Sequence, residues 1–230
     1  MSVHHRDDIE VQEVAVGSRR LPGTLRIPAG ASGLVVFAHG SGSSRLSPRN
    51  TMVAEALNDA GLATLLFDLL EPGEEDANNR ANVFDIGLLA DRVVDAIAWV
   101  GRTTPLKALP IGLFGASTGA AAALVAAAHL GKRVGAVVSR GGRPDLAEDA
   151  LEHVEAPTLL IVGGADYGVI ELNETAFARL HCTKRLEIVP GATHLFPERG
   201  ALEDVIRLAA EWFTQHLHRR KGAPRAVRGS

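Results

Sequence analysis

The stretch Gly115-Ala116-Ser117-Thr118-Gly119 has the pattern G-x-S-x-G and joins two segments of different character. The mostly apolar run before it is typical of a buried strand, and the alanine-rich segment 120–130 after it is typical of a closely packed helix. Strand, G-x-S-x-G and helix form a nucleophile elbow, a tight turn that exposes a serine hydroxyl above a sheet. A side chain at either glycine would collide with the turning backbone. We predict Ser117 as a nucleophile; a structural Gly-Ser turn is the alternative.

A serine hydroxyl needs a neighbouring base to attack a carbonyl, and that base needs an acid to orient it. In enzymes with this turn the acid and then the histidine follow the serine along the chain, each after a strand. Asp166 follows the apolar run 158–162, and His194 follows the run 186–189. Asp166 lies 49 residues after Ser117 (166 − 117), and His194 lies 28 residues after Asp166 (194 − 166). We therefore predict Ser117, Asp166 and His194 as nucleophile, acid and base.

Other residues compete for the roles of acid and base. Asp145, which follows the preceding strand, is the alternative acid; Asp166 is preferred because it lies closer to its strand end. A turn or helix cap is the other interpretation of Asp166. Seven of the nine histidines lie in terminal segments or on or beside predicted helices. Of the other two, His39 is expected to shape its loop, which leaves His194 as the general base.

A second Gly-Ser segment, His39-Gly40-Ser41-Gly42-Ser43-Ser44, follows a predicted strand and precedes a predicted helix. Enzymes with a nucleophile elbow take one backbone N–H donor for the oxyanion from this place, and the other from the residue after the nucleophile. We predict the N–H groups of Ser41 and Thr118 as these donors. A phosphate-binding loop is the alternative, but neither G-x-G-x-x-G nor a Walker lysine pattern fits.

Strand-like and helical segments alternate along the chain. Two β-prone runs, 11–16 and 21–27, predict an N-terminal hairpin. Further strands are expected at 34–38, 62–67, 109–114, 134–139, 158–162 and 186–189, and helices at 48–60, 86–100, 120–130, 148–154, 171–180 and 202–217. The first helix is expected to start after an N-cap at Ser47 and to stop at Gly61. This alternation predicts an α/β fold whose mainly parallel sheet is flanked by helices on both faces.

Length and composition exclude several classes of protein. The length of 230 residues and a hydrophobic content of 46%, with 4% aromatic residues, predict one domain over 1–217. The basic, low-complexity sequence over 218–230 predicts a flexible tail. A net charge of −3 predicts no electrostatic attraction to nucleic acid or to an anionic membrane. No stretch of the sequence resembles a signal peptide or a membrane span. Cys182 is the only cysteine, so an internal disulfide is impossible. These features predict a cytoplasmic protein.

The chain resembles α/β-hydrolases of the dienelactone-hydrolase-like family from Leu34 to about Phe213. The resemblance rests on four stretches: FAHGSGSS at 37–44, FGASTG at 114–119, VGGAD at 162–166 and GATH at 191–194. It implies an α/β-hydrolase fold and the same triad, Ser117, Asp166 and His194. Dienelactone hydrolases proper carry cysteine as nucleophile, so the serine here favours carboxyl-ester hydrolysis in general. Relatives of this kind are sometimes joined to a phosphoribosyltransferase domain, for which no segment is recognisable here.

The residues and the resemblance together predict a serine esterase that works through an acyl-enzyme intermediate and needs no metal or organic cofactor. The only candidates for a cap, 69–82 and 140–148, are short, so an open site for small or short-acyl esters is expected. Arg140, just after a predicted strand, is a candidate for binding a substrate carboxylate, with a structural ion pair as the alternative. An acyltransferase or perhydrolase with the same triad is the alternative activity, and a non-catalytic binding protein is the alternative class.

Overall fold

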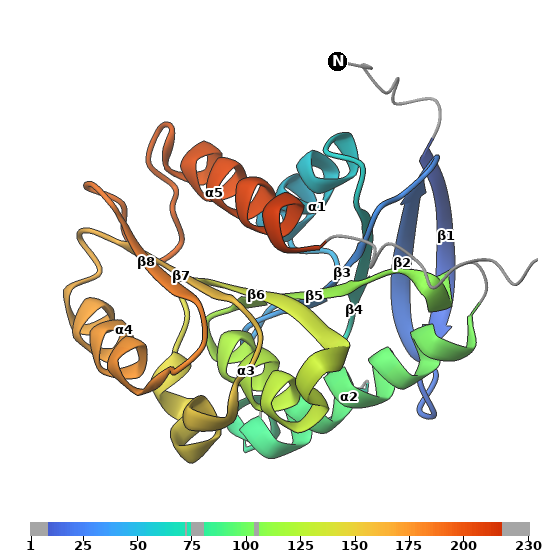
Figure 1. Ribbon diagram of the computed structural model, residues 1–230, viewed down its shortest axis with the longest axis horizontal. Helices are drawn as coiled ribbons and strands as arrows, with labels where there is room; N and C mark the ends of the chain where they lie inside the picture. The colour runs from blue at the N-terminus through green and yellow to red at the C-terminus, as the bar shows by residue number, and fades with distance from the viewer. Residues whose placement is uncertain (1–8, 72, 75–80, 104–105, 218–230) are drawn as a thin grey trace, which may run out of the picture.

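Eight strands form one sheet in the order β1-β2-β4-β3-β5-β6-β7-β8 (Figure 1). The structure is a computed structural model that describes residues 9–217 except 72, 75–80 and 104–105. The strands are β1 Ile9–Val16, β2 Leu21–Pro28, β3 Leu34–Ala38, β4 Ala63–Phe67, β5 Ile111–Ala116, β6 Val134–Arg140, β7 Thr158–Gly163 and β8 Lys184–Val189. β1 and β2 form the expected antiparallel hairpin, and β3 to β8 run parallel. The predicted α/β-hydrolase fold is confirmed by this topology.

Within the described ranges, five α-helices cover the two faces of the sheet. They are α1 Pro48–Asp59, α2 Ile86–Arg102, α3 Thr118–Leu130, α4 Tyr167–Arg179 and α5 Ala201–His216. α1 and α5 lie together on one face, and α2, α3 and α4 cover the other (Figure 1). None of the helices in the described ranges is long and apolar enough to cross a membrane.

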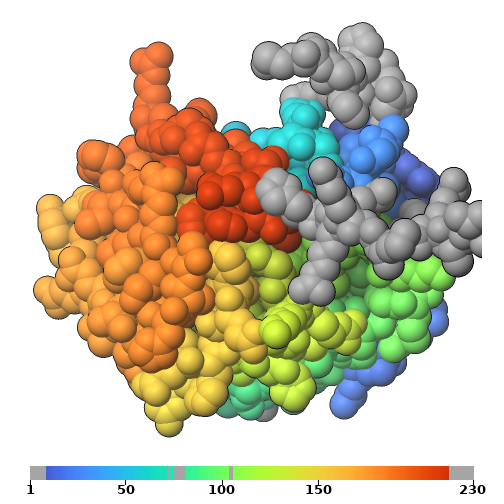
Figure 2. All heavy atoms as spheres, in the orientation of Figure 1, coloured from blue at the N-terminus to red at the C-terminus, as the bar shows by residue number. Residues whose placement is uncertain are grey.

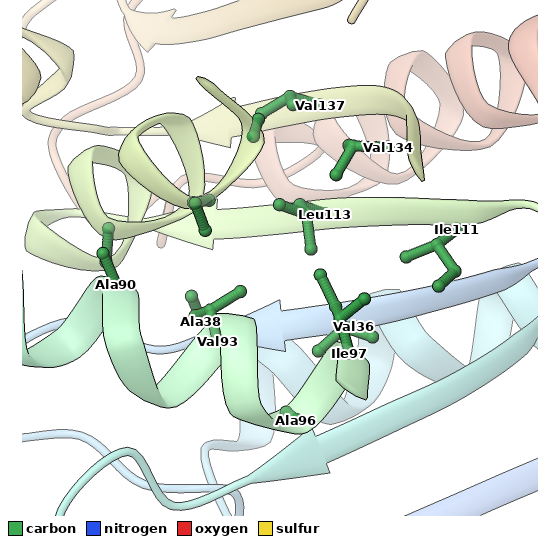
Figure 3. Packing of buried hydrophobic residues seen from close by; sticks show 14 of the residues in the cluster. Val36, Ala38, Ala90, Val93, Ala96, Ile97, Ile111, Leu113, Val134 and Val137 are labelled. Atoms are coloured by element: carbon green, nitrogen blue, oxygen red, sulfur yellow. The ribbon is translucent and has the colours of Figure 1, made fainter. Parts of the chain in front are cut away.

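Burial of both faces explains the continuous apolar strands. β3, β4 and β5 are buried at every position, as expected for parallel strands with helices above and below. Figure 3 shows one of the two cores, where side chains of β3, β5 and β6 meet α2. The second core lies between the other face and helices α1 and α5.

Two predicted helices differ from those observed. The expected helix at 148–154 is a 3-10 run, Pro144–His153, interrupted at Glu148, whose φ of 46° is incompatible with a continuing helix. The helix expected at 171–180 is α4, which begins at Tyr167 because the Asp166 carbonyl accepts hydrogen bonds from Val169 and Ile170. The predicted N-cap at Ser47 is confirmed, since its side chain accepts from the Asn50 N–H. The predicted tail 218–230 lies outside the described residues.

The order of the strands determines where loops can meet. The chain leaves β3 for β4 on one side and then crosses to β5 on the other, so that the carboxyl ends of β3 and β5 are adjacent, with Ala38 opposite Gly115. In open parallel sheets such a reversal opens a crevice at the carboxyl ends of the strands. The segments that follow β3, β5, β6, β7 and β8 all leave the sheet at this edge. In Figure 2 the orange-red segment between β8 and α5 protrudes at the upper left, so this connection lies at the surface.

Candidate active site

Ser117 occupies the turn between β5 and α3 in a conformation that non-glycine residues rarely adopt. Its φ is 51° and its ψ is −125°. Such a conformation costs on the order of 1–3 kcal/mol and persists only where the surrounding structure enforces it. The side chain is partly exposed, although the strand before it and the helix after it are buried. The turn therefore presents the hydroxyl at the carboxyl edge of the sheet.

Three glycines allow the backbone to pack tightly around this serine. A Cβ at Gly115 would lie 2.7 Å from the Gly119 carbonyl oxygen, and one at Gly119 would lie 2.5 Å from the His39 carbonyl oxygen. A Cβ at Gly40 would lie 2.9 Å from the Ser117 Cβ. Because real Cβ atoms do not approach other atoms so closely, these positions require glycine for steric reasons. The Gly40 contact also shows that the loop after β3 lies against the nucleophile.

Asp166 and His194 meet at the carboxyl ends of β7 and β8. The Nδ1 atom of His194 lies 2.7 Å from Oδ2 of Asp166. The Asp166 side chain is 15% exposed and that of His194 is 38% exposed, so the acid is sheltered and the imidazole reaches solvent. A carboxylate at Nδ1 fixes the ring so that Nε2 is available to another group. Nε2, at the opposite end of the imidazole, makes no hydrogen bond with the described residues and can therefore transfer a proton.

The loop of His194 packs against the loop that supports Ser117. The N–H of Ser117 donates to the carbonyl of Arg140 at 3.4 Å. At the next residue, Gly141, a Cβ would lie 2.7 Å from the His194 carbonyl oxygen and 3.7 Å from its Nδ1. No hydrogen bond joins Ser117 Oγ to His194 among the described residues, and without substrate such catalytic hydrogen bonds are often long. The two side chains nevertheless belong to adjoining loops.

Two contacts hold the histidine loop in shape. The carboxylate of Glu198 accepts hydrogen bonds from the N–H of Thr193 at 3.1 Å and from its hydroxyl at 2.6 Å. The Thr193 hydroxyl holds the pKa of Glu198 below its usual value. Phe196 has a φ of 54° and is buried in the core beneath α5. The Thr193–Glu198 contact and the buried Phe196 ring thus lie on either side of His194. The position of His194 after a strand did not predict either of them.

The predicted oxyanion donors also lie together. The N–H of Ser41 donates to the side-chain hydroxyl of Thr118 at 3.0 Å, which brings the loop after β3 to the first residue of α3. His39 supports this loop from below: its Nε2 accepts from the N–H of Leu69 at 3.0 Å, and its Nδ1 lies 3.0 Å from the Gly40 carbonyl oxygen. An imidazole that accepts at Nε2 and donates at Nδ1 is neutral and has no free nitrogen. His39 thus acts as a loop-shaping residue.

The alternative acid, Asp145, is engaged elsewhere. Its two carboxylate oxygens accept from Arg143 at 2.9 and 2.8 Å. This bidentate pair raises the pKa of Arg143. Arg140 is buried and donates from Nη2 to Asn50 Oδ1 at 3.1 Å, and no ion pair among the described residues includes it. Arg140 therefore does not form the structural bridge to Asp145 that the sequence left open.

Hollows of very different size lie at the two ends of the sheet. A hollow of about 10 Å³, lined by Ser41 and by apolar side chains that include Leu69 and Leu89, lies beside the oxyanion loop. A hollow of about 660 Å³ lies at the other end of the sheet, around the starts of β5, β6 and β7. Within the described ranges no group of three His, Cys, Asp or Glu side chains could hold a metal ion.

Comparison with known proteins identifies the family to which this chain is similar. A family model for the alpha/beta hydrolase fold matches residues 33–167. The crystal structure of a dienelactone hydrolase from Anabaena variabilis is 56% identical in sequence to this chain and has a TM-score of 0.88. The match covers 92% of this chain and 100% of that one. The protein Est1E of Butyrivibrio proteoclasticus is 17% identical with a TM-score of 0.74, over 90% of this chain and 98% of that one, a likeness of fold.

Curated relatives in two strains of Mycobacterium tuberculosis are longer proteins. They are provisionally named phosphoribosyl transferases and are 60% identical over 210 residues, which make up 91% of this chain. Those residues are 47% of each relative, so the chain spans about half the length of the curated relatives it matches. The family match, the shared topology and the 56% identical structure agree. The chain belongs to the α/β-hydrolases, in their dienelactone-hydrolase-like family.

Proposed function

We propose that this protein is a serine hydrolase that cleaves small carboxylic esters with Ser117, His194 and Asp166. The observation that carries the proposal is the 2.7 Å contact between His194 Nδ1 and Asp166 Oδ2, on loops that adjoin the strained turn of Ser117. A sheltered carboxylate that orients an imidazole is what a serine needs to become a nucleophile at neutral pH.

The reaction proceeds in two steps. Nε2 of His194 takes the proton of Ser117 Oγ as that oxygen attacks the ester carbonyl, and Asp166 stabilises the imidazolium that forms. The imidazolium then protonates the leaving alkoxide, and the acyl group remains on Ser117. A water molecule, deprotonated by the same imidazole, attacks the acyl-enzyme and releases the acid.

Negative charge on the carbonyl oxygen is stabilised by the N–H groups of Thr118 and Ser41. Each donor of this kind contributes about 3 kcal/mol. In the free protein the Ser41 N–H donates to the Thr118 hydroxyl, so this hydroxyl must turn away before the oxyanion can use that donor. The helix α3 begins at Thr118, and its positive N-terminal end favours the same charge.

The lining of the hollow at the oxyanion loop supports an apolar acyl or alcohol group at the elbow. Leu69, Leu70, Val83 and Leu89 line it beside Ser41. The name phosphoribosyl transferase belongs to relatives of which this chain covers 47%. The residues gathered at the elbow are a nucleophile, a base and an acid rather than a phosphate-binding loop.

Labelling with a fluorophosphonate probe tests this function. We expect the wild-type protein to be labelled and to hydrolyse 4-nitrophenyl acetate, and the Ser117→Ala variant to do neither. Ser43→Ala, on the loop after β3, is the matched control and should behave like the wild type. Equal labelling of the wild type and Ser117→Ala, or of neither, would contradict the proposal.

A further inference from the structure

Most of the large apolar side chains that the fold leaves in solvent lie near the carboxyl edge of the sheet. A single exposed apolar side chain is common on a protein surface, whereas several around one site indicate a place where an apolar group binds. Of the seven in the described part of the chain, two lie on the outer strands of the sheet, Val11 on β1 and Ile188 on β8. The other five lie on the segments that follow the carboxyl ends of the strands, and we call them the apolar rim: Leu46, Met52, Phe84, Tyr167 and Leu195.

Two residues of the apolar rim lie directly beside the candidate acid and base. Tyr167 follows Asp166 and is 75% exposed, and Leu195 follows His194 and is 45% exposed. β7 and β8 are neighbours in the sheet, and the 2.7 Å contact between Asp166 and His194 joins the loops that follow these strands. The two exposed apolar residues are therefore placed at the edge of the acid–base contact.

The backbone at both residues is held in place by neighbouring contacts. The Asp166 carbonyl accepts the first hydrogen bonds of α4, and Tyr167 is the first residue of that helix. Leu195 directly precedes Phe196, whose ring is buried in the core beneath α5. A surface whose backbone is already ordered loses less conformational entropy when a ligand covers it. The removal of apolar area from water can therefore contribute to binding.

The proposed reaction determines which part of an ester meets these two residues. After Ser117 attacks, the imidazolium of His194 must give its proton to the oxygen of the leaving alcohol. That oxygen therefore lies within hydrogen-bonding distance of Nε2, and the carbon skeleton of the alcohol begins beside the histidine loop. The carbonyl oxygen faces the N–H groups of Ser41 and Thr118 instead, and the hollow beside Ser41 is left to the acyl group.

We propose that Tyr167 and Leu195 form an alcohol-binding site, which makes esters of bulky apolar alcohols the substrate class of this enzyme. The proposal rests on the proposed esterase function and names the substrate class of that site. An aryl or branched alkyl group on the alcohol covers the exposed Leu195 side chain and packs against the Tyr167 ring, a large apolar surface that suits a second ring. Selection at this site comes from buried apolar area rather than from charge.

Two isomeric esters test the site, because they carry the same phenyl group on opposite sides of the ester bond. Benzyl acetate has the phenyl group on the alcohol, methyl phenylacetate has it on the acid, and methyl acetate is the reference without it. We expect the wild type to prefer benzyl acetate to methyl acetate by about tenfold or more in kcat/KM, a factor that one apolar contact can supply. Benzyl alcohol and methanol are similarly basic, so this preference measures binding of the alcohol rather than its quality as a leaving group.

Variants assign the preference to the two residues. Tyr167→Ser and Leu195→Ser should each lower the preference for benzyl acetate over methyl acetate by about threefold or more, and the double variant should abolish it. The preference for methyl phenylacetate over methyl acetate should not change, because the acyl group lies elsewhere; damage to Asp166 or His194 would instead slow all three esters alike. Val11→Ser is the matched control, because it removes an exposed apolar side chain from the outer strand β1 and should keep both preferences. An equal preference for benzyl acetate in the wild type and the double variant, or no such preference in the wild type, would overturn the site.

A binding measurement separates this proposal from the function on which it rests. Saturation-transfer NMR should detect bound benzyl alcohol on the wild type and on Ser117→Ala, and much less of it on the double variant of Tyr167 and Leu195. If the fluorophosphonate probe labels Ser117 and neither benzyl alcohol binding nor ester preference depends on these two residues, the alcohol site is wrong and the esterase function stands. If Ser117 is not labelled but benzyl alcohol binding depends on them, the esterase function is wrong and the apolar site stands.

Discussion

At the scale of single residues, a few hydrogen bonds determine the orientation of each candidate catalytic acid. The carboxylate of Asp166 is directed at His194 by its place between β7 and α4, whereas Asp145, which lies farther from its strand end, is held by Arg143. Sequence alone ranked the two acids by their distance from a strand end. The hydrogen-bond partners supply a physical reason for the same ranking.

Asp166→Asn and Asp145→Asn form a matched pair that tests this assignment. An asparagine at 166 would leave His194 in the wrong tautomer, and we expect kcat for 4-nitrophenyl acetate to fall by about 10⁴ with little change in Tm. Asp145→Asn should lose only a partly exposed ion pair, worth roughly 1 kcal/mol or less in the free energy of unfolding. Loss of activity in Asp145→Asn alone would show that the acid is Asp145.

The hydroxyl of Thr118 gives a second prediction at this scale. Its hydrogen bond with the Ser41 N–H belongs to the free protein and must break when the oxyanion takes that donor. An interaction made in the ground state and lost in the transition state slows the reaction. We therefore expect Thr118→Ala to raise kcat, by up to about fivefold for a net hydrogen bond of about 1 kcal/mol. Thr118→Ser keeps the hydroxyl and serves as control; a lower kcat in Thr118→Ala alone would refute the argument.

At the scale of secondary-structure elements, the loops at the carboxyl edge of the sheet carry the site, and the connection from β8 to α5 carries its candidate base, His194. Glu198 tethers Thr193, the residue just before His194, and Phe196 anchors the same loop in the core. The loop therefore depends on one exposed polar contact and one buried aromatic ring.

Glu198→Gln tests the polar contact. Hydrogen bonding to Thr193 lowers the pKa of Glu198 in the folded state, so the charged tether stabilises the loop above the unfolded pKa and is lost as the pH falls through the folded pKa. We expect Glu198→Gln to lower kcat a few-fold near neutral pH, with at most a small decrease in Tm because the contact is exposed. The gap between variant and wild type should close in acid once Glu198 is protonated. A gap independent of pH would mean that the charge of Glu198 is not responsible.

Most elements were predictable because burial leaves a local pattern. Parallel strands covered on both faces are apolar runs, and Ser47 and Gly61 mark the ends of α1 by their chemistry. The start of α4 could not be predicted, because it depends on backbone hydrogen bonds. The break at Glu148 could not be predicted either, because no residue type there indicates a positive φ. Asn50 and Arg140 are 90 residues apart, so their contact follows from how α1 packs on the sheet, which no spacing reveals.

At the scale of the whole molecule, the candidate site and the contact of α5 with the start of β5 lie at opposite ends of the sheet. The candidate site occupies the carboxyl ends of the strands. The other end of β5 is held by α5, where a Cβ at Gly112 would lie 2.7 Å from the ring of Phe213. Gly112 and Ser117 are five residues apart in sequence (117 − 112), about 16 Å along a strand at 3.3 Å per residue.

This separation predicts that Phe213→Ala changes stability and leaves the chemistry intact. Phe213 is fully buried between α5 and the sheet, and truncation of such a ring costs about 3–5 kcal/mol in the free energy of unfolding. Denaturant titration should show this loss, whereas kcat of the folded fraction at low temperature should match that of the wild type. Leu57→Ala, on α1 in the same core, is the matched variant: its truncation should also cost stability and leave the chemistry intact. A lower kcat in the folded fraction of either variant would show that packing at this end of the sheet affects the candidate site.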